Sequence, residues 1–379
     1  MAVVFVFSSL MIIYTFVLYP ITVFLLARFK TSQSKISAKS KPKGELPKIT
    51  VIMVVYNESD KILAKLNNIF SSDYPSEKLS IIVASDGSND NTVDLINSCG
   101  YRNVNCLAFK QRRGKAACLN DAVAHAKTDY LIMCDVRQMI ASNAIASLIS
   151  TLQSPDVGAV SGELTFTQEG ENSYSKGIDA YWRYEKFVRQ NESNINSTVG
   201  VTGALYAMKK SLYTSIPSGT ILDDVLIPMN VVMQGKRVLF QQDAIAVDVP
   251  SNDPEREKNR KKRTLAGNFQ LLALNKNILN PFKNPIFFQF ISHKLFRLLS
   301  PYFMLLALLS NMLIVEQHGF FKITLIIQCS FYAFAIIGKL TPRLHNVSVF
   351  RVALAFVSLN WFAVLGLLEY LKSDKTYLW

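Results

Sequence analysis

Residues 3–27 form a run without a single charged side chain. A helix that crosses a bilayer needs about 20 apolar residues, so this run is long enough to span a membrane. A cleaved signal peptide is the alternative, although no basic segment precedes the run and the run exceeds the usual apolar core of such a peptide. Arg28 and Lys30 follow directly, and basic flanks stay in the cytoplasm. We therefore expect an N-terminal transmembrane helix over residues 1–28.

The C-terminal part of the chain is apolar again. Residues 284–297 mix Phe, Ile and Leu with His293, Lys294 and Arg297, which predicts an amphipathic helix in the membrane interface. Residues 298–371 hold three further candidate transmembrane helices, Leu298–Val315, Phe320–Gly338 and Val352–Leu368. Buried helices of a soluble protein are the alternative. The number of runs and their basic flanks favour an integral protein of the inner or plasma membrane.

The net charge is +13, from 41 basic and 28 acidic side chains. Such an excess suits either nucleic acid or the anionic inner leaflet of a membrane. The basic residues gather beside the apolar runs, in residues 29–47, which we expect to be an irregular linker, and in residues 256–263. This placement favours a membrane partner and no nucleic acid. The five cysteines lack C-x-x-C spacing, so we expect reduced thiols and no zinc site.

Between residues 48 and 281, β-rich and helical segments alternate. The expected strands are residues 50–55, 79–84, 130–133 and 157–161, and the expected helices are residues 61–69, 92–98, 115–125 and 143–152. Strands that alternate with helices are typical of βαβ units and a mostly parallel sheet. We therefore expect an α/β, Rossmann-like domain over residues 48–281, on the cytoplasmic side of the membrane.

Short polar motifs follow three of the expected strands. They are Tyr56-Asn57-Glu58, Ser85-Asp86-Gly87-Ser88-Asn89-Asp90 and Cys134-Asp135-Val136-Arg137. The carboxyl ends of parallel strands form the crevice where open α/β sheets bind ligands. In that crevice Tyr56 can stack on a base, and Glu58 and Asp86 can accept hydrogen bonds from a nucleoside. Ordinary turns are the alternative, with Asn57 or Ser88 capping the next helix.

Other charged residues suit phosphate, a cation and proton transfer. Asp135 can hold Mg²⁺ or Mn²⁺ if phosphates complete the coordination shell, or it can simply pair with Arg137. Lys115 opens a helix after a basic loop and suits phosphate, with a solvated turn as the alternative. Asp223 and Asp224 precede an expected helix at residues 225–233, where one can act as a general base and the other can cap the helix.

The order and spacing of these motifs, over nearly the whole chain, resemble the family 2 glycosyltransferases. These are inverting enzymes of the GT-A fold that include membrane polysaccharide synthases. The resemblance implies that Asp224 is the catalytic base, that Asp135 binds a divalent cation, Mg²⁺ or Mn²⁺, and that Asp86 contacts the nucleoside. The remaining donor-binding residues implied by the resemblance are Tyr56, Glu58, Lys115, Arg137, Arg260 and Arg263.

Two motifs depart from the family pattern. The D-x-D position is Asp135-Val136-Arg137, so a cation that can pair with phosphate replaces the second carboxylate. The Q-x-x-R-W position is Arg260-Lys261-Lys262-Arg263-Thr264, without Gln or Trp. In processive members that Trp packs near the acceptor sugar, so its absence argues against processivity.

The resemblance implies transfer of a sugar from a nucleotide-diphosphate donor to a glycan or lipid-linked acceptor, in exopolysaccharide, capsule or glycolipid assembly. Export or polymerase proteins are candidate partners. Two alternatives stay open: a processive synthase whose membrane helices form a glycan channel, and a non-catalytic scaffold that binds a sugar nucleotide. A transporter is disfavoured because the apolar runs carry no acidic residue at mid-depth.

Overall fold

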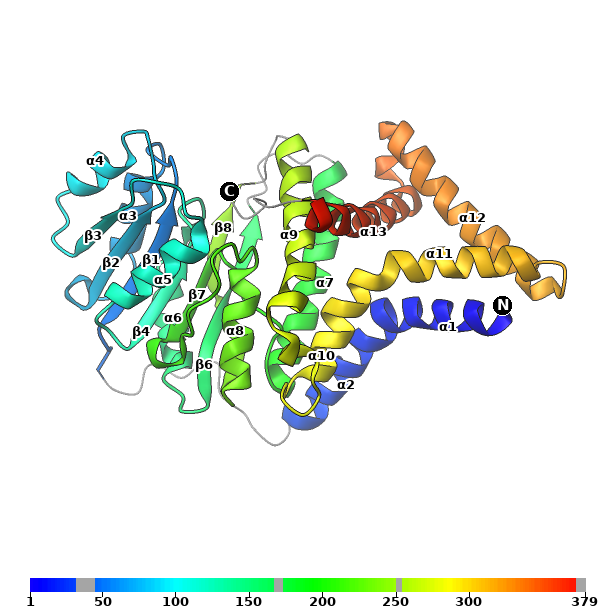
Figure 1. Ribbon diagram of the computed structural model, residues 1–379, viewed down its shortest axis with the longest axis horizontal. Helices are drawn as coiled ribbons and strands as arrows, with labels where there is room; N and C mark the ends of the chain where they lie inside the picture. The colour runs from blue at the N-terminus through cyan, green and yellow to red at the C-terminus, as the bar shows by residue number, and fades with distance from the viewer. Residues whose placement is uncertain (32–44, 167–172, 250–253, 373–379) are drawn as a thin grey trace.

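The computed structural model describes residues 1–31, 45–166, 173–249 and 254–372 (Figure 1). An α/β domain occupies one side of the molecule, and long apolar helices project from its other side. Most of the expected linker and the last residues of the chain lie outside the described residues. The predicted domain limits, 48–281 for the α/β part and 298–371 for the C-terminal spans, therefore stay predictions.

The α/β domain is built on one eight-stranded sheet with the order β3-β2-β1-β4-β7-β6-β8-β5. The strands are β1 (Ile49–Val55), β2 (Leu79–Ser85), β3 (Val104–Ala108), β4 (Tyr130–Cys134), β5 (Met139–Ile140), β6 (Val157–Phe166), β7 (Leu205–Lys209) and β8 (Arg237–Asp248). Strands β3, β2, β1 and β4 are parallel, as are β6 and β8, whereas β7 is antiparallel to both its neighbours. All seven residues of β1 are buried, as expected for a central strand covered on both faces.

Helices cover both faces of the sheet. One core contains residues of α3 (Ile62–Phe70), α4 (Thr92–Asn97) and α6 (Ala144–Leu152). The other contains residues of α5 (Lys115–His125), α8 (Asp223–Met233), α9 (Pro254–Leu274) and α10 (Phe287–Phe290). This confirms the predicted α/β fold with a mostly parallel sheet. It also shows that residues just ahead of the membrane segments belong to the domain core.

Four helical segments are long and apolar enough to cross a membrane among the described residues, at Ala2–Lys30, Phe287–Ile314, Gly319–Leu340 and Ser348–Lys372. The first consists of α1 (Ala2–Ile13), a π-helical turn η1 (Tyr14–Leu18) and α2 (Tyr19–Thr31). The second consists of α10, the π-helical turn η5 (Ile291–Leu295) and α11 (Phe296–Ile314), and the others are α12 (Gly319–Leu340) and α13 (Ser348–Lys372). Large apolar side chains on α12, such as Ile326 at 64% exposure, face outward. Such a surface fits a lipid environment.

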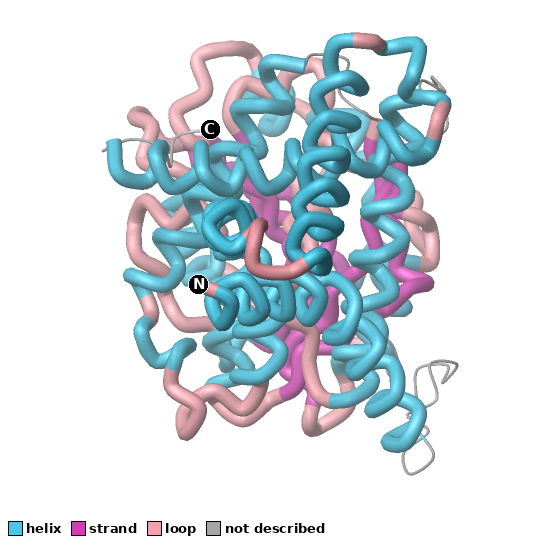
Figure 2. The backbone as a smooth tube through the Cα atoms, turned by 90° about the vertical axis from the view of Figure 1, so that its right-hand side faces the viewer, coloured by secondary structure: helices cyan, strands magenta, loops and turns pink. Residues whose placement is uncertain are grey.

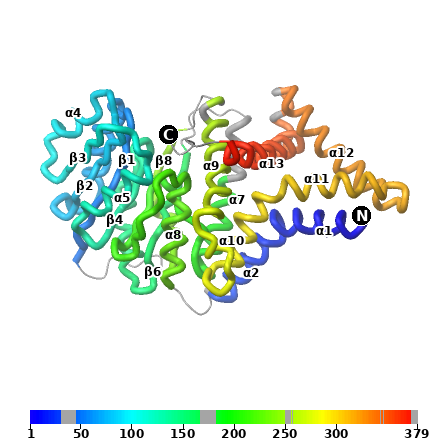
Figure 3. Tube along the Cα trace, viewed as in Figure 1, coloured from blue at the N-terminus to red at the C-terminus, as the bar shows by residue number. Residues whose placement is uncertain are grey.

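The N-terminal and C-terminal apolar segments lie together. Helix α1 runs beside α11 in Figure 3, where the blue and yellow traces are adjacent, and Phe5 of α1 packs against Phe321 of α12 with ring centroids 5.7 Å apart. Figure 2 views the molecule from the side on which the apolar helices lie, and there these helices stand in front of the strands. The expected interfacial helix at residues 284–297 is not separate from the next span, because residues 287–314 form one continuous helical segment.

Two long polar helices were not predicted. They are α7 (Ser173–Ile195) and α9, which carries the basic run. Helix α7 buries Glu185 and Glu192, whose charges conceal its inward face from a hydrophobicity pattern. Strands β3, β7 and β8 were also missed, and β7 and β8 give the sheet its antiparallel and C-terminal part.

Candidate active site

The predicted motifs meet at the carboxyl ends of the parallel strands. Tyr56 follows β1, Asp86 follows β2 and Asp135 follows β4, and these three strands are neighbours in the sheet. Asp224 comes from the first turn of α8. The expectation that strand ends gather these side chains at one edge is met by the topology.

Lys115 and two aspartates form the charged centre of the site. The Lys115 ammonium lies 3.0 Å from Oδ1 of Asp135 and 3.4 Å from Oδ2 of Asp223. Burial opposes the charge on Lys115, but Asp135 and Asp223 outweigh it, so the pKa of the ammonium is raised. Asp135 pairs with Lys115, and no ion pair between Asp135 and Arg137 is found among the described residues.

Asp224 is a partly buried carboxyl beside this centre. Burial, followed by the nearby charge of Asp223, raises its pKa to about 6, while Lys115 acts in the opposite direction. A carboxyl with this pKa is ionised near neutral pH and can still accept a proton, as a general base must. The backbone N–H of Val201 donates to the Asp224 carbonyl at 2.8 Å and ties the loop after α7 to the start of α8.

Gly203 leaves open space between two of these carboxylates. A β-carbon there would lie 3.7 Å from Oδ2 of Asp135 and 3.8 Å from Oδ2 of Asp224. A small enclosed cavity in this region is lined by Lys115, Asp135, Gly203, Tyr206 and Asp223 among others. The buried hydroxyl of Tyr206 finds no hydrogen-bond partner within the described residues. A buried polar group without a partner marks a place for water or ligand.

Asp86 is completely buried and is held by the loop before α5. Its carboxylate accepts hydrogen bonds from the backbone N–H groups of Arg113 at 2.6 Å and Gly114 at 3.1 Å. Gly87 has φ +72°, and a β-carbon there would lie 2.9 Å from the backbone nitrogen of Arg112. The structure therefore gives Asp86 a role in shaping the loop, and its contact with a nucleoside stays a prediction.

Tyr56 and Glu58 have neighbours of their own. The guanidinium of Arg112 stacks 3.8 Å from the centre of the Tyr56 ring. Glu58 forms an ion pair with Lys61, with 2.8 Å between Oε2 and Nζ. Tyr56 thus sits against the basic loop, and the proposed stacking of a base on it stays untested.

Arg137 is tied to a residue that the sequence did not single out. Its guanidinium pairs with Oδ2 of Asp248, the last residue of β8, at 2.5 Å. The side chain of Gln138 donates to the same oxygen at 3.0 Å, and Asp248 is 1% exposed. Nothing in the sequence pattern indicated Asp248, because the β8 strand that presents it was not predicted.

The basic run lies on α9, where its arginines differ. Arg260 is paired with Glu257 of the same helix at 2.9 Å. Arg263 is more buried, and burial lowers the pKa of its guanidinium while the charges of Asp223 and Asp135 raise it. Its Nε is buried without a hydrogen-bond partner among the described residues. The charge of Arg263 thus interacts with Asp223 and Asp135 of the charged centre, whereas Arg260 is paired within its own helix.

Helix α9 also braces the segment that leads to Asp224. Gln270 accepts from the backbone N–H of Ile221 at 2.9 Å and donates to the Gly219 carbonyl at 2.8 Å. A β-carbon at Gly267 would come within 2.7 Å of Leu222. The close approach at this glycine fixes α9 against the turn that begins α8.

The donor set fits a cation that is held partly by substrate phosphates. No group of three His, Cys, Asp or Glu side chains able to hold a metal occurs within the described parts of the chain. Asp135, with its side chain 40% exposed, and the space beside Gly203 instead offer a single carboxylate next to an open position. Magnesium is commonly bound by one or two carboxylates plus phosphates.

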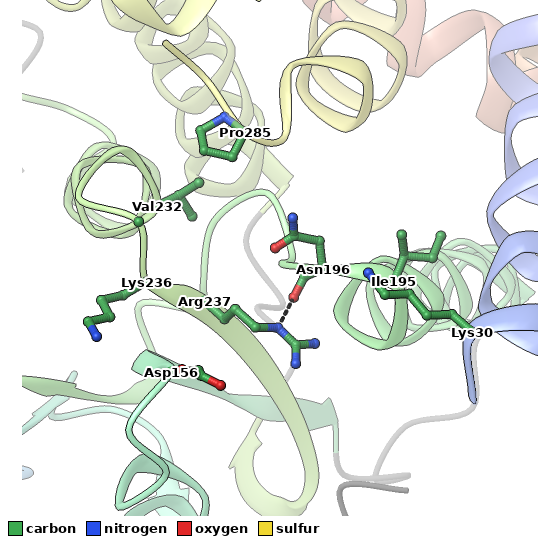
Figure 4. Close-up of a pocket in the computed structure, with 9 residues that line it drawn as sticks. Lys30, Asp156, Ile195, Asn196, Val232, Lys236, Arg237 and Pro285 are labelled. Carbon is green, nitrogen blue, oxygen red and sulfur yellow. Dashed lines mark hydrogen bonds between the residues drawn. The ribbon is translucent and has the colours of Figure 1, made fainter. Parts of the chain in front are cut away.

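A larger cavity of about 320 Å³ lies elsewhere (Figure 4). Its lining includes Asp156, just before β6, and Arg237, the first residue of β8. Those residues mark the opposite ends of the strands from the carboxylates. The Arg237 guanidinium is engaged with the carbonyl of Asn196 at 2.8 Å, as Figure 4 shows, so this cavity is not part of the candidate active site.

The fold is similar to that of a solved glycosyltransferase. A mannosyltransferase from Pyrobaculum calidifontis, PcManGT, solved in complex with GDP-Man and Mn²⁺, superposes with a TM-score of 0.68. The match covers 94% of this chain and 99% of that protein at 22% identity. The α/β domain therefore has the GT-A fold, as predicted.

The particular family follows from sequence. Residues 50–215 match Glycosyl transferase family 2, and residues 136–365 match Glycosyl transferase family group 2. The chain belongs to the family 2 glycosyltransferases. The prediction that the protein is a glycosyltransferase is thereby confirmed.

Two relatives found by sequence cover a smaller part of this chain. A poly-β-1,6-N-acetyl-D-glucosamine synthase of Staphylococcus aureus (strain MSSA476) is 26% identical over 219 residues, which are 56% of this chain and 53% of that protein. The glycosyltransferase AglE of Haloferax volcanii is 25% identical over 158 residues, 41% of this chain and 52% of that protein. The chain thus matches about half the length of these relatives.

Proposed function

We propose that this protein is a membrane-bound inverting glycosyltransferase that moves a sugar from a nucleotide-diphosphate donor to a glycan or lipid-linked acceptor. The observation that carries the proposal is that Asp135 and Asp224 approach the same point at Gly203, where a β-carbon would lie 3.7 Å from Oδ2 of Asp135 and 3.8 Å from Oδ2 of Asp224. One carboxylate is paired with a lysine, and the other has a pKa of about 6. This combination suits a donor diphosphate beside a proton acceptor.

In the proposed reaction, Asp224 removes the proton from the acceptor hydroxyl, which attacks the anomeric carbon as the bond to the diphosphate breaks. Lys115 and Arg263 place positive charge where the leaving nucleoside diphosphate gathers negative charge. Asp135 would hold a divalent cation, Mg²⁺ or Mn²⁺, which when bound neutralises phosphate charge. Attack on the face opposite the leaving group inverts the configuration at the anomeric carbon.

Residues outside this centre complete the proposed donor site. Tyr56 and Glu58 follow β1, Asp86 follows β2, and all three are proposed to line the nucleoside end. Arg137 has a side chain that is 37% exposed beside its ion pair with Asp248, so it can still face a phosphate. Arg260 is proposed to bind a donor phosphate once its ion pair with Glu257 is broken.

We place the catalytic domain in the cytoplasm. Basic residues follow the first apolar segment at Arg28 and Lys30 and stand in the last turn of α12 at Lys339, and basic flanks remain in the cytoplasm. A protein anchored in this way meets sugar nucleotides on one side and a lipid-linked or growing glycan at the membrane. Proteins of export or polymerisation are the proposed partners.

Replacement of Asp224 by Asn tests the proposal. The full-length protein in detergent or lipid nanodiscs is screened against a panel of UDP- and GDP-sugars, with released nucleoside diphosphate as the readout. The Asp224→Asn variant is expected to lose transfer while it still binds the donor, because the amide cannot accept the proton. Asp121→Asn, on the outer part of α5, is the matched control. Wild-type turnover in Asp224→Asn would refute the assignment of the base.

A processive synthase is the second candidate. The similarity to the staphylococcal synthase favours it, although that match covers only 56% of this chain. The sizes of the products distinguish the two candidates. A single added sugar supports the first proposal, and a long polymer made by the isolated protein supports the second.

A further inference from the structure

A buried charged cluster joins the catalytic domain to the first two apolar segments, Ala2–Lys30 and Phe287–Ile314. We call it the junction cluster, and its members are Tyr19 of α2, Glu185 and Glu192 of α7, His293 of η5 and Arg297 of α11. Tyr19 and Glu192 are fully buried, and His293 is 1% exposed. None of these residues belongs to the motifs of the candidate active site.

His293 lies between two carboxylates. Its Nδ1 is 2.8 Å from Oε1 of Glu192, and its Nε2 is 3.1 Å from Oε1 of Glu185. Carboxylate oxygens accept hydrogen bonds, so each ring nitrogen of His293 faces a hydrogen-bond acceptor. Removing one partner of a buried ion pair leaves an uncompensated charge, which destabilises the fold. The partners of such a pair are therefore held in fixed positions relative to each other.

The other members extend the connection to both segments. Arg297 donates to Oε2 of Glu185 at 2.7 Å, and the hydroxyl of Tyr19 donates to Glu192. Burial alone would raise the pKa of the Glu185 carboxyl, but the cations of His293 and Arg297 hold it well below the usual range. The first apolar segment and residues 291–297 are thus both bound to α7 by charged hydrogen bonds.

The cluster is connected to the proposed base through α7 and the loop that follows it. Lys294 is the next residue after His293, and the charges of Lys294 and Arg189 both act on Asp224 and lower its pKa against burial. Arg189 is itself paired with Glu185 at 3.2 Å. The α7 helix ends at Ile195, and the loop after it binds the Asp224 backbone through Val201. The same helix therefore holds the cluster at one face and leads to the base at its end.

We propose that His293 is a positioning residue: held between Glu185 and Glu192, it fixes the start of the membrane segment so that Lys294 stands on the acceptor side of Asp224. The inference rests on the proposed role of Asp224. It assigns the junction cluster to acceptor alignment and leaves donor binding to the strand ends, since neither His293 nor Lys294 lies at the Lys115–Asp135 centre.

The test uses full-length protein in nanodiscs and the donor found active in the nucleotide-sugar screen. His293→Gln is expected to lower kcat for transfer about 10- to 100-fold, the range for a misplaced positioning residue, while the KM for the donor stays within about twofold. The double variant Glu192→Gln, His293→Gln should recover most of the loss, because a neutral amide pair satisfies the same hydrogen bonds. His318→Gln, on an exposed histidine before α12, is the control and should behave as wild type.

Lys294→Met covers the case in which His293→Gln does not fold. This substitution removes the Lys294 charge that acts on Asp224, and the partly exposed position should tolerate it. The variant should show the same loss of kcat, while the donor KM and the thermal midpoint stay unchanged. Unchanged kcat in both folded variants, or equal changes in kcat and donor KM, would overturn the inference. A double variant no better than His293→Gln would do so as well. Activity in Asp224→Asn would instead refute the proposed function, whichever way the His293 variants behave.

Discussion

The ammonium of Lys115 lies 3.0 Å from Oδ1 of Asp135 and joins the start of α5 to the end of β4. The pair lies at the carboxyl ends of the strands. Oδ2 of Asp223, at the start of α8, lies 3.4 Å from the same ammonium. In the D-x-D position the second carboxylate is replaced by Arg137, which turns away to Asp248. The cation paired with Asp135 is therefore Lys115, at the start of α5.

Lys115→Met is predicted to lower kcat/KM about 100-fold, the loss expected when one charged group that stabilises the leaving diphosphate is removed. The fold should persist, because methionine fills a similar volume. Steady-state release of nucleoside diphosphate measures the effect. Lys127→Met, on an exposed lysine after α5, is the control; a loss of equal size in that variant would contradict the prediction.

The activity of the wild-type protein is predicted to fall below about pH 6. Asp224 must be ionised to accept a proton, and its pKa is raised to about 6, so the fraction of active base falls about tenfold for each pH unit below that value. Asp223→Asn should move this acidic limb to lower pH, because the charge of Asp223 raises the pKa of Asp224. The measurement is kcat/KM from pH 4.5 to 8. A limb that moves to higher pH in Asp223→Asn would contradict the assignment.

Gly203→Ala is predicted to reduce activity with little effect on stability. The added β-carbon would make ordinary contacts at 3.7–3.8 Å with Asp135 and Asp224, so folding tolerates it, but it occupies the space between the two carboxylates. We expect about a tenfold loss of kcat/KM, close to 1.4 kcal/mol of transition-state stabilisation. Gly319→Ala, where a β-carbon meets nothing within 4 Å, is the control. Wild-type kinetics in Gly203→Ala would show that neither donor nor acceptor uses this space.

Gly366→Leu is predicted to destabilise the contact between α13 and α9. A β-carbon at Gly366 would lie 2.6 Å from that of Leu265, so the two helices must separate. Overpacking of this kind costs about 1–3 kcal/mol. The thermal midpoint in detergent should fall, and activity should fall with it, because α9 carries Arg263 and braces Ile221. Gly319→Leu is the matched control, and an unchanged midpoint in Gly366→Leu would argue against this packing.

Local patterns predicted the elements with simple periodicity. The β-rich runs at β1, β2, β4 and β6 and the amphipathic helices α3, α5 and α6 appear near their expected limits. The charge-free runs predicted the candidate spans, since only length and apolarity matter there. Helix α7 was missed because its inward face carries Glu185 and Glu192, both of which His293 contacts from more than 100 residues away in the sequence.

The sequence by itself determined the family, the α/β rhythm, the four apolar segments and the residue types of the site. Only the tertiary structure decided which charges meet. Asp135 faces Lys115, Arg137 faces Asp248 and His293 lies between Glu185 and Glu192. The spacing of a motif gives distances along the sequence within one strand or helix. Ion pairs form between elements that the sheet and the membrane segments bring together in the folded structure. An ionisable side chain acquires its state from those neighbours and its burial.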